Sequence, residues 1–407
     1  MCGVAGIISL SGAPIERLEA KLRVMNDLIA HRGPDGEGVW CATHGSAGLA
    51  HRRLSILDLS QTGAQPMLAP NGTALVHNGE VYNFIELRDT LKDGWTFRGT
   101  SDTETILAAY ARYGDDFLDH LRGMFAFALW DDRNRRLVAA RDRFGVKPFY
   151  YAEIGDQLYF ASEAKAILPF LPSIETDPDA LSQYLTFQYG VDDLTLFKGI
   201  KQLLPGHRLV VSNGGVDIQR YWDVNYEVDW DHSPEYFHRR LRELLDESVA
   251  MHLRSDVPVG GYMSGGIDSS LISILAARLS HQNRQFFHGK FTEFPGYDES
   301  PYAELAATSA EGELHQIDIT AQHFQDNIAK VIYHLDYPCA APGSFPQFMV
   351  SQLARACEGC PRRSRRRRDL RRLRALPRRL FRAMHQSRCR GHVSKRQLHR
   401  HHRVHYT

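Results

Sequence analysis

A glycine-rich turn between an apolar run and a helical stretch is the feature that most limits how this chain can fold. Residues 257–263 are apolar enough for a buried strand, residues 264–270 contain two adjacent glycines, and residues 269–279 have helical character. A second apolar run follows at residues 285–291. Strand, turn, helix and strand in this order are typical of a parallel sheet. We therefore predict an α/β domain over residues 233–360.

The first part of the chain has a different pattern, in which short β-rich runs alternate with glycine and proline. Helical stretches at residues 17–30 and 103–113 interrupt these runs, and Asp102 is placed to cap the second. This pattern predicts an α+β domain of mostly antiparallel strands over residues 2–185. Residues 186–232 are predicted to connect the two domains. The expected strands of the first domain lie at residues 4–10, 73–76, 125–130, 136–140 and 158–161.

Charge is divided unevenly between the body of the chain and its tail. Residues 361–407 carry 17 arginines and one lysine against one acid, Asp369, whereas the first 360 residues hold 31 basic and 47 acidic residues. The tail has too little apolar content to form a core, and we expect it to be disordered. A nucleic-acid-binding arm is the alternative that we favour less, since neutralising phosphates requires only such charge. It predicts binding that weakens steeply with salt.

The sequence has neither of the two patterns that would indicate a membrane or secreted protein. No apolar run reaches the roughly 18 residues of a membrane helix, and the first residues do not resemble a secretion signal. We therefore expect a cytoplasmic protein with no membrane partner. Cys357 and Cys360 have the C-x-x-C spacing, but no second pair completes a zinc site.

Cys2 directly follows the initiator methionine and precedes Gly3. A side chain this small allows the methionine to be removed, which leaves a thiol and a free α-amine on the same residue. An α-amine has a reference pKa of about 8, close to that of a thiol, so it can act as the general base for the thiol. The start of the chain therefore predicts chemistry by an N-terminal nucleophile.

The glycine-rich turn also predicts a phosphate site. Glycines let the backbone curl around phosphate oxygens, while serine hydroxyls and a helix N-terminus supply hydrogen-bond donors. Asp268 would repel a bare phosphate, so its presence indicates a magnesium ion held between carboxylate and pyrophosphate. The spacing differs from that of a Walker-type loop, which argues against a P-loop kinase.

Together these segments resemble the glutamine-hydrolysing asparagine synthetase family over residues 1 to about 356. The sequence Ser-Gly-Gly-Ile-Asp-Ser-Ser at residues 264–270 is similar to the pyrophosphatase loop of that family, and Met-Cys-Gly is similar to its start. The number of separate motifs in one order makes coincidence negligible. The other matching motifs lie, in order, at residues 31–35, 53–58, 65–67, 78–83, 101–104 and 297–300.

For the first domain, the resemblance implies an N-terminal nucleophile hydrolase fold, with layered antiparallel sheets and helices, acting as a glutaminase. Cys2 would attack the glutamine amide, and the Asn78 side chain and the Gly79 N–H would stabilise the oxyanion. Arg53 would bind the α-carboxylate of glutamine, and Glu80 and Asp102 would receive its α-ammonium group. The implied glutamine-binding set is Arg53, Leu54, Ser55, Ile56, Leu57, Asn78, Gly79, Glu80 and Asp102.

For the second domain, the resemblance implies a partial ATP-pyrophosphatase domain that uses ATP and Mg²⁺ to convert aspartate into an acyl-adenylate, from which ammonia displaces AMP. A homodimer is also implied. His288 is weighed evenly between adenine contact and core packing. Residues 288–291 depart from the apolar pattern of the family, so another acceptor carboxylate stays open. The implied ATP-binding set is Met263, Ser264, Gly265, Gly266, Asp268, Ser269, Ser270 and His288, with Asp268 as the metal ligand.

The resemblance stops after Ala356, where arginines replace the Ser-Gly-Glu-Gly-Gly-Asp-Glu-Leu-Phe-Gly-Gly-Tyr segment of the family. Residues 366–377 can be encoded by codons that, read one nucleotide later, give Gly-Asp-Glu-Ile-Phe-Gly-Gly-Tyr-Ala-Arg-Tyr. We therefore hypothesise a one-base frameshift between about Ala356 and Pro361, which would impair the activity of the second domain. Sequencing the gene across this region decides the hypothesis, and an intact frame that matches related chains through the tail would contradict it.

Overall fold

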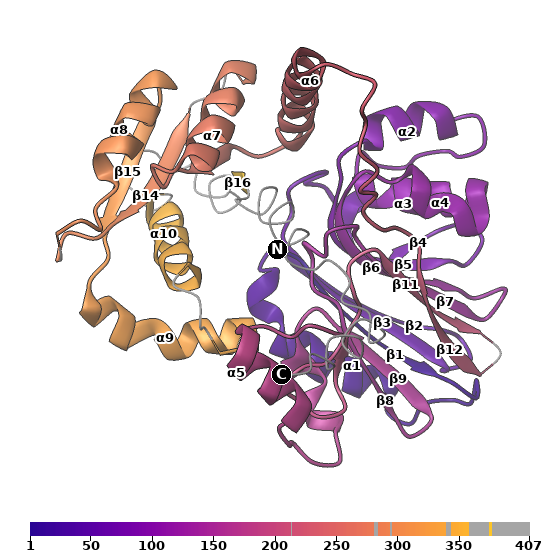
Figure 1. The fold of residues 1–407 in the computed structure, drawn as a ribbon. Helices are drawn as coiled ribbons and strands as arrows, with labels where there is room; N and C mark the ends of the chain where they lie inside the picture. Colours follow the sequence, from indigo (N-terminus) through magenta and orange to yellow (C-terminus); the bar gives the residue numbers. More distant parts are fainter. Residues whose placement is uncertain (213, 281–283, 294, 339–342, 358–373, 377–407) are drawn as a thin grey trace, which may run out of the picture.

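The computed structural model describes all residues except 213, 281–283, 294, 339–342, 358–373 and 377–407. The described residues form two domains, one built on two antiparallel sheets and one on a parallel sheet (Figure 1). Among the described helices, none has both the length and the apolar character that crossing a membrane requires.

Two six-stranded sheets form the first domain, and every strand pair in them is antiparallel. In spatial order, the first sheet consists of β10 (Lys201–Gln202), β8 (Tyr150–Ile154), β9 (Gln157–Ala161), β1 (Gly3–Ser9), β3 (Ala47–Arg53) and β2 (Gly36–Cys41). The second sheet consists of β12 (Gly215–Arg220), β11 (His207–Ser212), β7 (Arg136–Arg141), β6 (Gly123–Asp131), β5 (Ala74–Val81) and β4 (Met67–Leu68).

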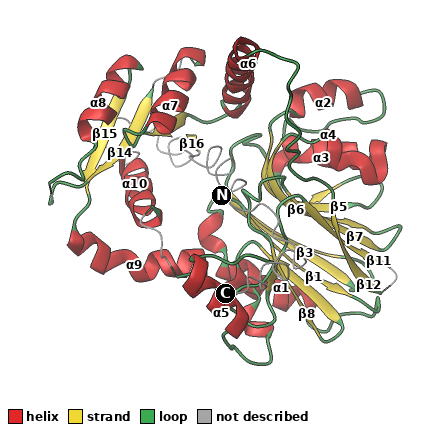
Figure 2. Ribbon diagram, viewed as in Figure 1, coloured by secondary structure: helices red, strands yellow, loops and turns green. Residues whose placement is uncertain are grey.

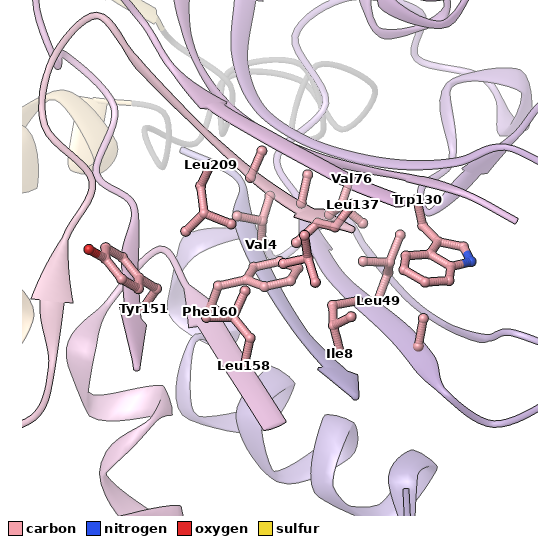
Figure 3. Packing of buried hydrophobic residues seen from close by; sticks show 14 of the residues in the cluster. Val4, Ile8, Leu49, Val76, Trp130, Leu137, Tyr151, Leu158, Phe160 and Leu209 are labelled. Carbon is pink, nitrogen blue, oxygen red and sulfur yellow. The ribbon is translucent and has the colours of Figure 1, made fainter. Parts of the chain in front are cut away.

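The two sheets pack face to face around an apolar core (Figure 3). Val4, Ile8 and Phe160 of the first sheet meet Val76 and Leu137 of the second, and all five side chains are buried. Because successive side chains alternate across a strand, the residues between these point to the outer faces of the sheets. Each sheet therefore needs a second apolar layer on its outer side.

Helices supply the outer layers. The first sheet is covered by α1 (Leu18–Leu28), whose Leu22 and Met25 are fully buried against it, and the second is covered by three helices. The resulting order of helix, sheet, sheet and helix (Figure 2) confirms the predicted layered α+β fold. The helices over the second sheet are α2 (Phe84–Leu91), α3 (Asp102–Tyr113) and α4 (Phe117–His120). Short 3₁₀ helices are η1 (Ala30–Arg32), η2 (Gln61–Gly63), η3 (Gly114–Asp116), η4 (Ala164–Ala166) and η5 (Leu168–Phe170).

The prediction that Asp102 caps α3 was wrong. The N-cap is Ser101, whose hydroxyl accepts the N–H of Thr103 at 3.1 Å. Asp102 is the first helical residue, and its carboxylate accepts the N–H of Val81 at 2.8 Å. The carboxylate therefore satisfies the end of β5, a strand distant in sequence, instead of its own helix.

The connection between the domains is shorter than the sequence predicted. Part of it forms β11 and β12, which extend the second sheet, and α5 (Pro178–Phe187) and β10 precede them. Leu209 and Val211 alternate into the core between the sheets, which explains why this segment is a strand pair. Only residues 221–233 separate β12 from the first helix of the second domain.

The second domain contains the predicted parallel sheet. Apolar side chains cover both faces, with Met263 and Phe286 packed against α7 and α8 on one face and Phe287 packed against α10 on the other. In spatial order the strands are β15 (Glu313–Asp318), β14 (Gln285–Lys290), β13 (Val259–Tyr262) and β16 (Arg374–Leu376). The helices are α6 (Pro234–His252), α7 (Ile267–Leu279), α8 (Ser300–Ser309), α9 (Ala321–Leu335) and α10 (Ser344–Cys357).

A short piece of the basic tail belongs to this sheet. Arg374–Leu376 form β16, which pairs in parallel with β13, so the prediction that residues 361–407 are entirely disordered was wrong for these three residues. Backbone pairing of this kind satisfies a strand edge without requiring a particular side chain. Residues 361–373 and 377–407, Cys360 and the part of the proposed frameshift interval from residue 358 onwards lie outside the described residues.

Candidate active site

A cavity of about 490 Å³ lies beside Cys2 and is lined by both domains. The first domain contributes the two residues before β1, the loop after β3 and the end of β5, while the second contributes Tyr262, α9 and α10. Figure 1 shows the N-terminus on the side of the first domain that faces the second. The structure brings nine of the predicted residues to this cavity, namely Cys2, Arg53, Leu54, Ile56, Leu57, Asn78, Gly79, Glu80 and Asp102.

Contacts on both sides fix Cys2. Its Sγ lies 3.4 Å from the N–H and 3.5 Å from the carbonyl oxygen of Leu54, in the loop after β3. Its own carbonyl oxygen accepts a 2.8 Å hydrogen bond from Nε of Arg32. The thiol is therefore held against the rim of the cavity.

Asn78 and Gly79 line the cavity near the end of β5. Asn78 is fully buried, and within the described residues neither Oδ1 nor Nδ2 of its amide has a hydrogen-bond partner. Leaving a buried amide unsatisfied is unfavourable in a folded protein, so this amide is available to a ligand that enters the cavity. Gly79 has φ 157°, and a Cβ there would lie 2.1 Å from the carbonyl oxygen of Met124, so glycine alone fits.

The charged residues predicted to hold glutamine surround the same cavity. Glu80 and Asp102 are buried, at 6% and 5% exposure. The Arg53 guanidinium donates to the carbonyl of Ser60 at 2.9 Å and to those of Leu57 and Asp58. Arg53 therefore fixes the loop that lines the cavity, and its contact with a glutamine α-carboxylate stays a prediction.

The loop after β3 is also held from the second domain. The N–H of Asp58 donates to a carboxylate oxygen of Asp256 at 2.7 Å, and the N–H of Asp256 donates to the carbonyl of Ile56 at 3.1 Å. Ser55, predicted to bind glutamine, is buried away from the cavity lining, and its N–H donates to Asp35 at 2.9 Å. Ser55 thus helps to fix the loop on the side that faces away from the cavity.

Sequence reasoning missed a buried polar network next to Asn78. Oε1 of Gln65 accepts the N–H of His77 at 2.6 Å, and Nδ1 of His77 lies 3.1 Å from Oγ1 of Thr103. Nε2 of His51 lies 3.1 Å from the carbonyl oxygen of His77. The matching motif at residues 65–67 pointed to Gln65, whereas neither histidine stands in a pattern that marks a site.

We expect the stability of the first domain to fall as the pH drops from 6.5 towards 3. Burial lowers the pKa of His51 and of His77 to about 3, so both stay neutral in the folded protein while the unfolded chain binds protons. Each histidine then contributes a slope of about 1.4 kcal/mol per pH unit within that window. Thermal melting between pH 7 and 5 should give a shallower slope for His77→Gln and an unchanged slope for His44→Gln, an exposed control. Equal slopes in all three proteins would contradict this prediction.

In the second domain, the glycine-rich turn joins β13 to α7. The N–H of Ser264 donates to Oγ of Ser269 at 3.1 Å, and their hydroxyls lie 2.9 Å apart. Gly265 has φ 84°, and a Cβ there would lie 2.8 Å from the carbonyl oxygen of Glu299. Gly266 is the N-cap of α7 and makes no side-chain capping bond, so the first turn of the helix is left for an anion. This backbone fits the predicted pyrophosphate, with Ser270 in the same turn.

Met263 and His288 lie beneath this turn. Both are buried, and Nδ1 of His288 lies 2.8 Å from the carbonyl oxygen of Met263, while its Nε2 lies 3.5 Å from Oγ of Ser300. These contacts give His288 a role in supporting the turn. Asp268 is exposed at the start of α7. In the part of the chain that the structure describes, no group of three or more His, Cys, Asp or Glu side chains could hold a metal.

Comparisons with known proteins agree with this geometry. The family model for the glutamine amidotransferase domain matches residues 1–222, and the model for asparagine synthase matches residues 240–359. The fold and the site thus define a glutamine amidotransferase joined to a synthase domain. The chain belongs to the asparagine synthase family.

Relatives of the chain carry two kinds of name. Asparagine synthetase [glutamine-hydrolyzing] 1 of Bacillus subtilis is 36% identical over 87% of this chain and 56% of its own length. Amidase chry2 of Gibberella zeae is 34% identical over 83% of this chain and 54% of its own length. A putative asparagine synthetase of Methanocaldococcus jannaschii is 32% identical over 87% of this chain and 72% of its own length. The chain therefore spans about half the length of the first two relatives.

Proposed function

We propose that this chain hydrolyses glutamine at Cys2 and passes the ammonia to a carboxylate that the second domain activates with ATP. The observation that carries the proposal is the buried amide of Asn78, which has no hydrogen-bond partner among the described residues and lines the same cavity as Cys2. Such an amide is suited to an oxyanion that exists only during the reaction.

The first half of the reaction uses the first domain. After removal of Met1, the Cys2 thiol transfers its proton to the α-amine, and the thiolate attacks the glutamine amide carbon. Nδ2 of Asn78 and the N–H of Gly79 donate to the oxyanion. The α-ammonium of Cys2 returns its proton to the amide nitrogen as the intermediate collapses, which expels ammonia and leaves a thioester. Water then hydrolyses the thioester to glutamate and regenerates the thiol. Glu80 and Asp102 hold the α-ammonium group of the substrate throughout.

The second half uses the turn between β13 and α7. The N–H groups of Gly265 and Gly266, the hydroxyls of Ser264, Ser269 and Ser270, and the N-terminus of α7 would hold the pyrophosphate of ATP. Mg²⁺ is commonly bound by one or two carboxylates together with substrate phosphates, a mode that Asp268 fits. The ion would neutralise pyrophosphate charge. Met263 and His288 would keep the turn in place from below.

Aspartate is the acceptor that we propose first, with asparagine as the product. A second candidate is another carboxylate, and the similarity to amidase chry2 favours keeping it. The homodimer, the cytoplasmic location and the absence of a nucleic-acid partner stay predictions.

Isotope transfer tests the proposal. The purified full chain is incubated with amide-¹⁵N glutamine, ATP and Mg²⁺, once with aspartate and once with each other candidate acid. We expect labelled ammonia and glutamate in every reaction and labelled asparagine in the aspartate reaction. Label in another amide would identify the second candidate. Failure to form glutamate would contradict the proposal, as would intact Met1 on a protein that still consumes glutamine.

A further inference from the structure

Four charged side chains form a buried chain where the two domains meet. They are Arg32, Glu163 and Lys165 of the first domain and Asp336, which follows α9 in the second, and their side chains are 5% to 7% exposed. Nη1 of Arg32 lies 2.7 Å from Oε1 of Glu163, and Nζ of Lys165 lies 2.5 Å from Oε2 of Glu163. Nζ of Lys165 also lies 2.7 Å from Oδ1 of Asp336. We call these four residues the charge chain.

One end of the charge chain reaches the nucleophile. Nε of Arg32 donates a 2.8 Å hydrogen bond to the carbonyl oxygen of Cys2. That carbonyl is bonded to the Cα that carries both the amine and the thiol-bearing side chain of Cys2. A change in the position of Arg32 therefore reorients both reacting groups of the proposed nucleophile.

The other end is the docking point of α9. Asp336 ends this helix in the left-handed conformation, at φ 54°, and its carboxylate accepts the backbone N–H of Lys165 as well as binding its Nζ. His334, in the last turn of α9, packs its ring 4.5 Å from that of His31, whose Nε2 lies 3.0 Å from Glu163. Contacts from the second domain thus meet the charge chain at two points.

The charges within the chain balance, with two positive and two negative groups. Burial opposes the ionisation of Glu163, but the hydrogen bond from His31 and the charges of Arg32 and Lys165 outweigh it and lower its pKa to about 2. Loss of the Asp336 charge would leave the buried site with two cations and one anion, and Glu163 would be the only charge that compensates Lys165. Glu163 would then be drawn from Arg32 towards Lys165.

We propose that Asp336 is a positioning residue for Cys2, acting through Lys165, Glu163 and Arg32, so that docking of α9 sets the reactivity of the thiol. This inference rests on the proposed glutaminase function. It predicts that the first domain hydrolyses glutamine at its full rate only when Asp336 of the second domain is bound to Lys165.

The test compares Asp336→Asn with the unaltered full chain in two assays. Glutamate release should show kcat lowered about tenfold and KM for glutamine little changed, the pattern of a positioning defect. Mass spectrometry should show alkylation of Cys2 by iodoacetamide slowed by about the same factor. Cys41, half-buried on β2, is the internal reference and should react as before. Asp336→Glu, which keeps the charge, should recover most of both rates.

Glu175→Gln is the matched control, because it removes a carboxylate from an ion pair with Lys198 that is more than half exposed. Neither assay should change in this variant. A double variant, Lys165→Met with Asp336→Leu, removes the pair without leaving one charge buried. Glu163 then loses the cation that fixes its Oε2, so it holds Arg32 less firmly and Cys2 alkylation should be slowed in this variant as well.

Alkylation of Cys2 at an unchanged or increased rate in Asp336→Asn or in the double variant would overturn the inference, even if thermal stability falls. If the unaltered chain forms no glutamate, the proposed function fails, and the alkylation rates still decide whether Asp336 positions Cys2.

Discussion

Replacement of Cys2 by alanine should abolish glutamine hydrolysis, lowering glutamate release by at least about 10³-fold. Cys2 is the proposed source of both the attacking sulfur and, through its amine, the base. Alanine at this position keeps the amine and the small size that allows Met1 to be removed, so only the nucleophile is lost. Glutamate release measured with and without the substitution checks this result.

Cys41→Ala provides the control for that experiment. Cys41 is also a half-buried free thiol, but it lies on β2 and does not line the cavity. Its replacement should leave glutamate release unchanged. Comparable activity in Cys2→Ala would show that hydrolysis does not depend on this residue and would remove the basis of the proposed mechanism.

Asn78→Ala should lower kcat for glutamine hydrolysis by about 10² to 10³-fold, with a smaller effect on KM. The amide of Asn78 has no hydrogen-bond partner among the described residues, so its loss breaks no hydrogen bond there. The donor would act only on charge that develops in the transition state, which is why kcat should carry the effect. Steady-state kinetics of glutamate release provide the measurement.

Asn83, in the same sequence motif, is the matched control, because its replacement should affect stability and not catalysis. Its amide donates to the carbonyl of His120 at 2.9 Å and accepts the N–H of Arg122 at 2.8 Å. Asn83→Ala should therefore lower the melting temperature and leave kcat nearly unchanged. An unchanged kcat in Asn78→Ala would exclude it from the oxyanion site.

Local patterns were sufficient to predict most of the fold. A few neighbouring residues are enough to indicate the apolar run that forms β1. The same holds for the strand, turn and helix around Ser264. The role of Asp102 could not be predicted in this way, because its partner, the N–H of Val81, is 21 residues distant. The strands β11 and β12 were missed because nearby glycines and prolines obscured their alternating apolar residues.

The residues of the site likewise fall into those that local sequence patterns predicted and those that they did not. Cys2, Asn78 and Gly79 were found because the chemistry of a terminal thiol and a matching motif mark them. Asp336 carries no such mark, since it meets Lys165 only after both domains have folded, across a separation of 171 residues. His77 was missed for a related reason, because a histidine in an apolar strand gives no sign of the Thr103 hydroxyl that it contacts.

The close approach of β6 to Gly79 has a genetic consequence. Every single-base change in a glycine codon that alters the amino acid introduces a Cβ, and even the smallest such side chain would lie 2.1 Å from the carbonyl oxygen of Met124. Apart from a stop codon, point mutation therefore offers this codon only silent changes or steric conflict. A saturation library selected for a functional protein should retain glycine alone at this position.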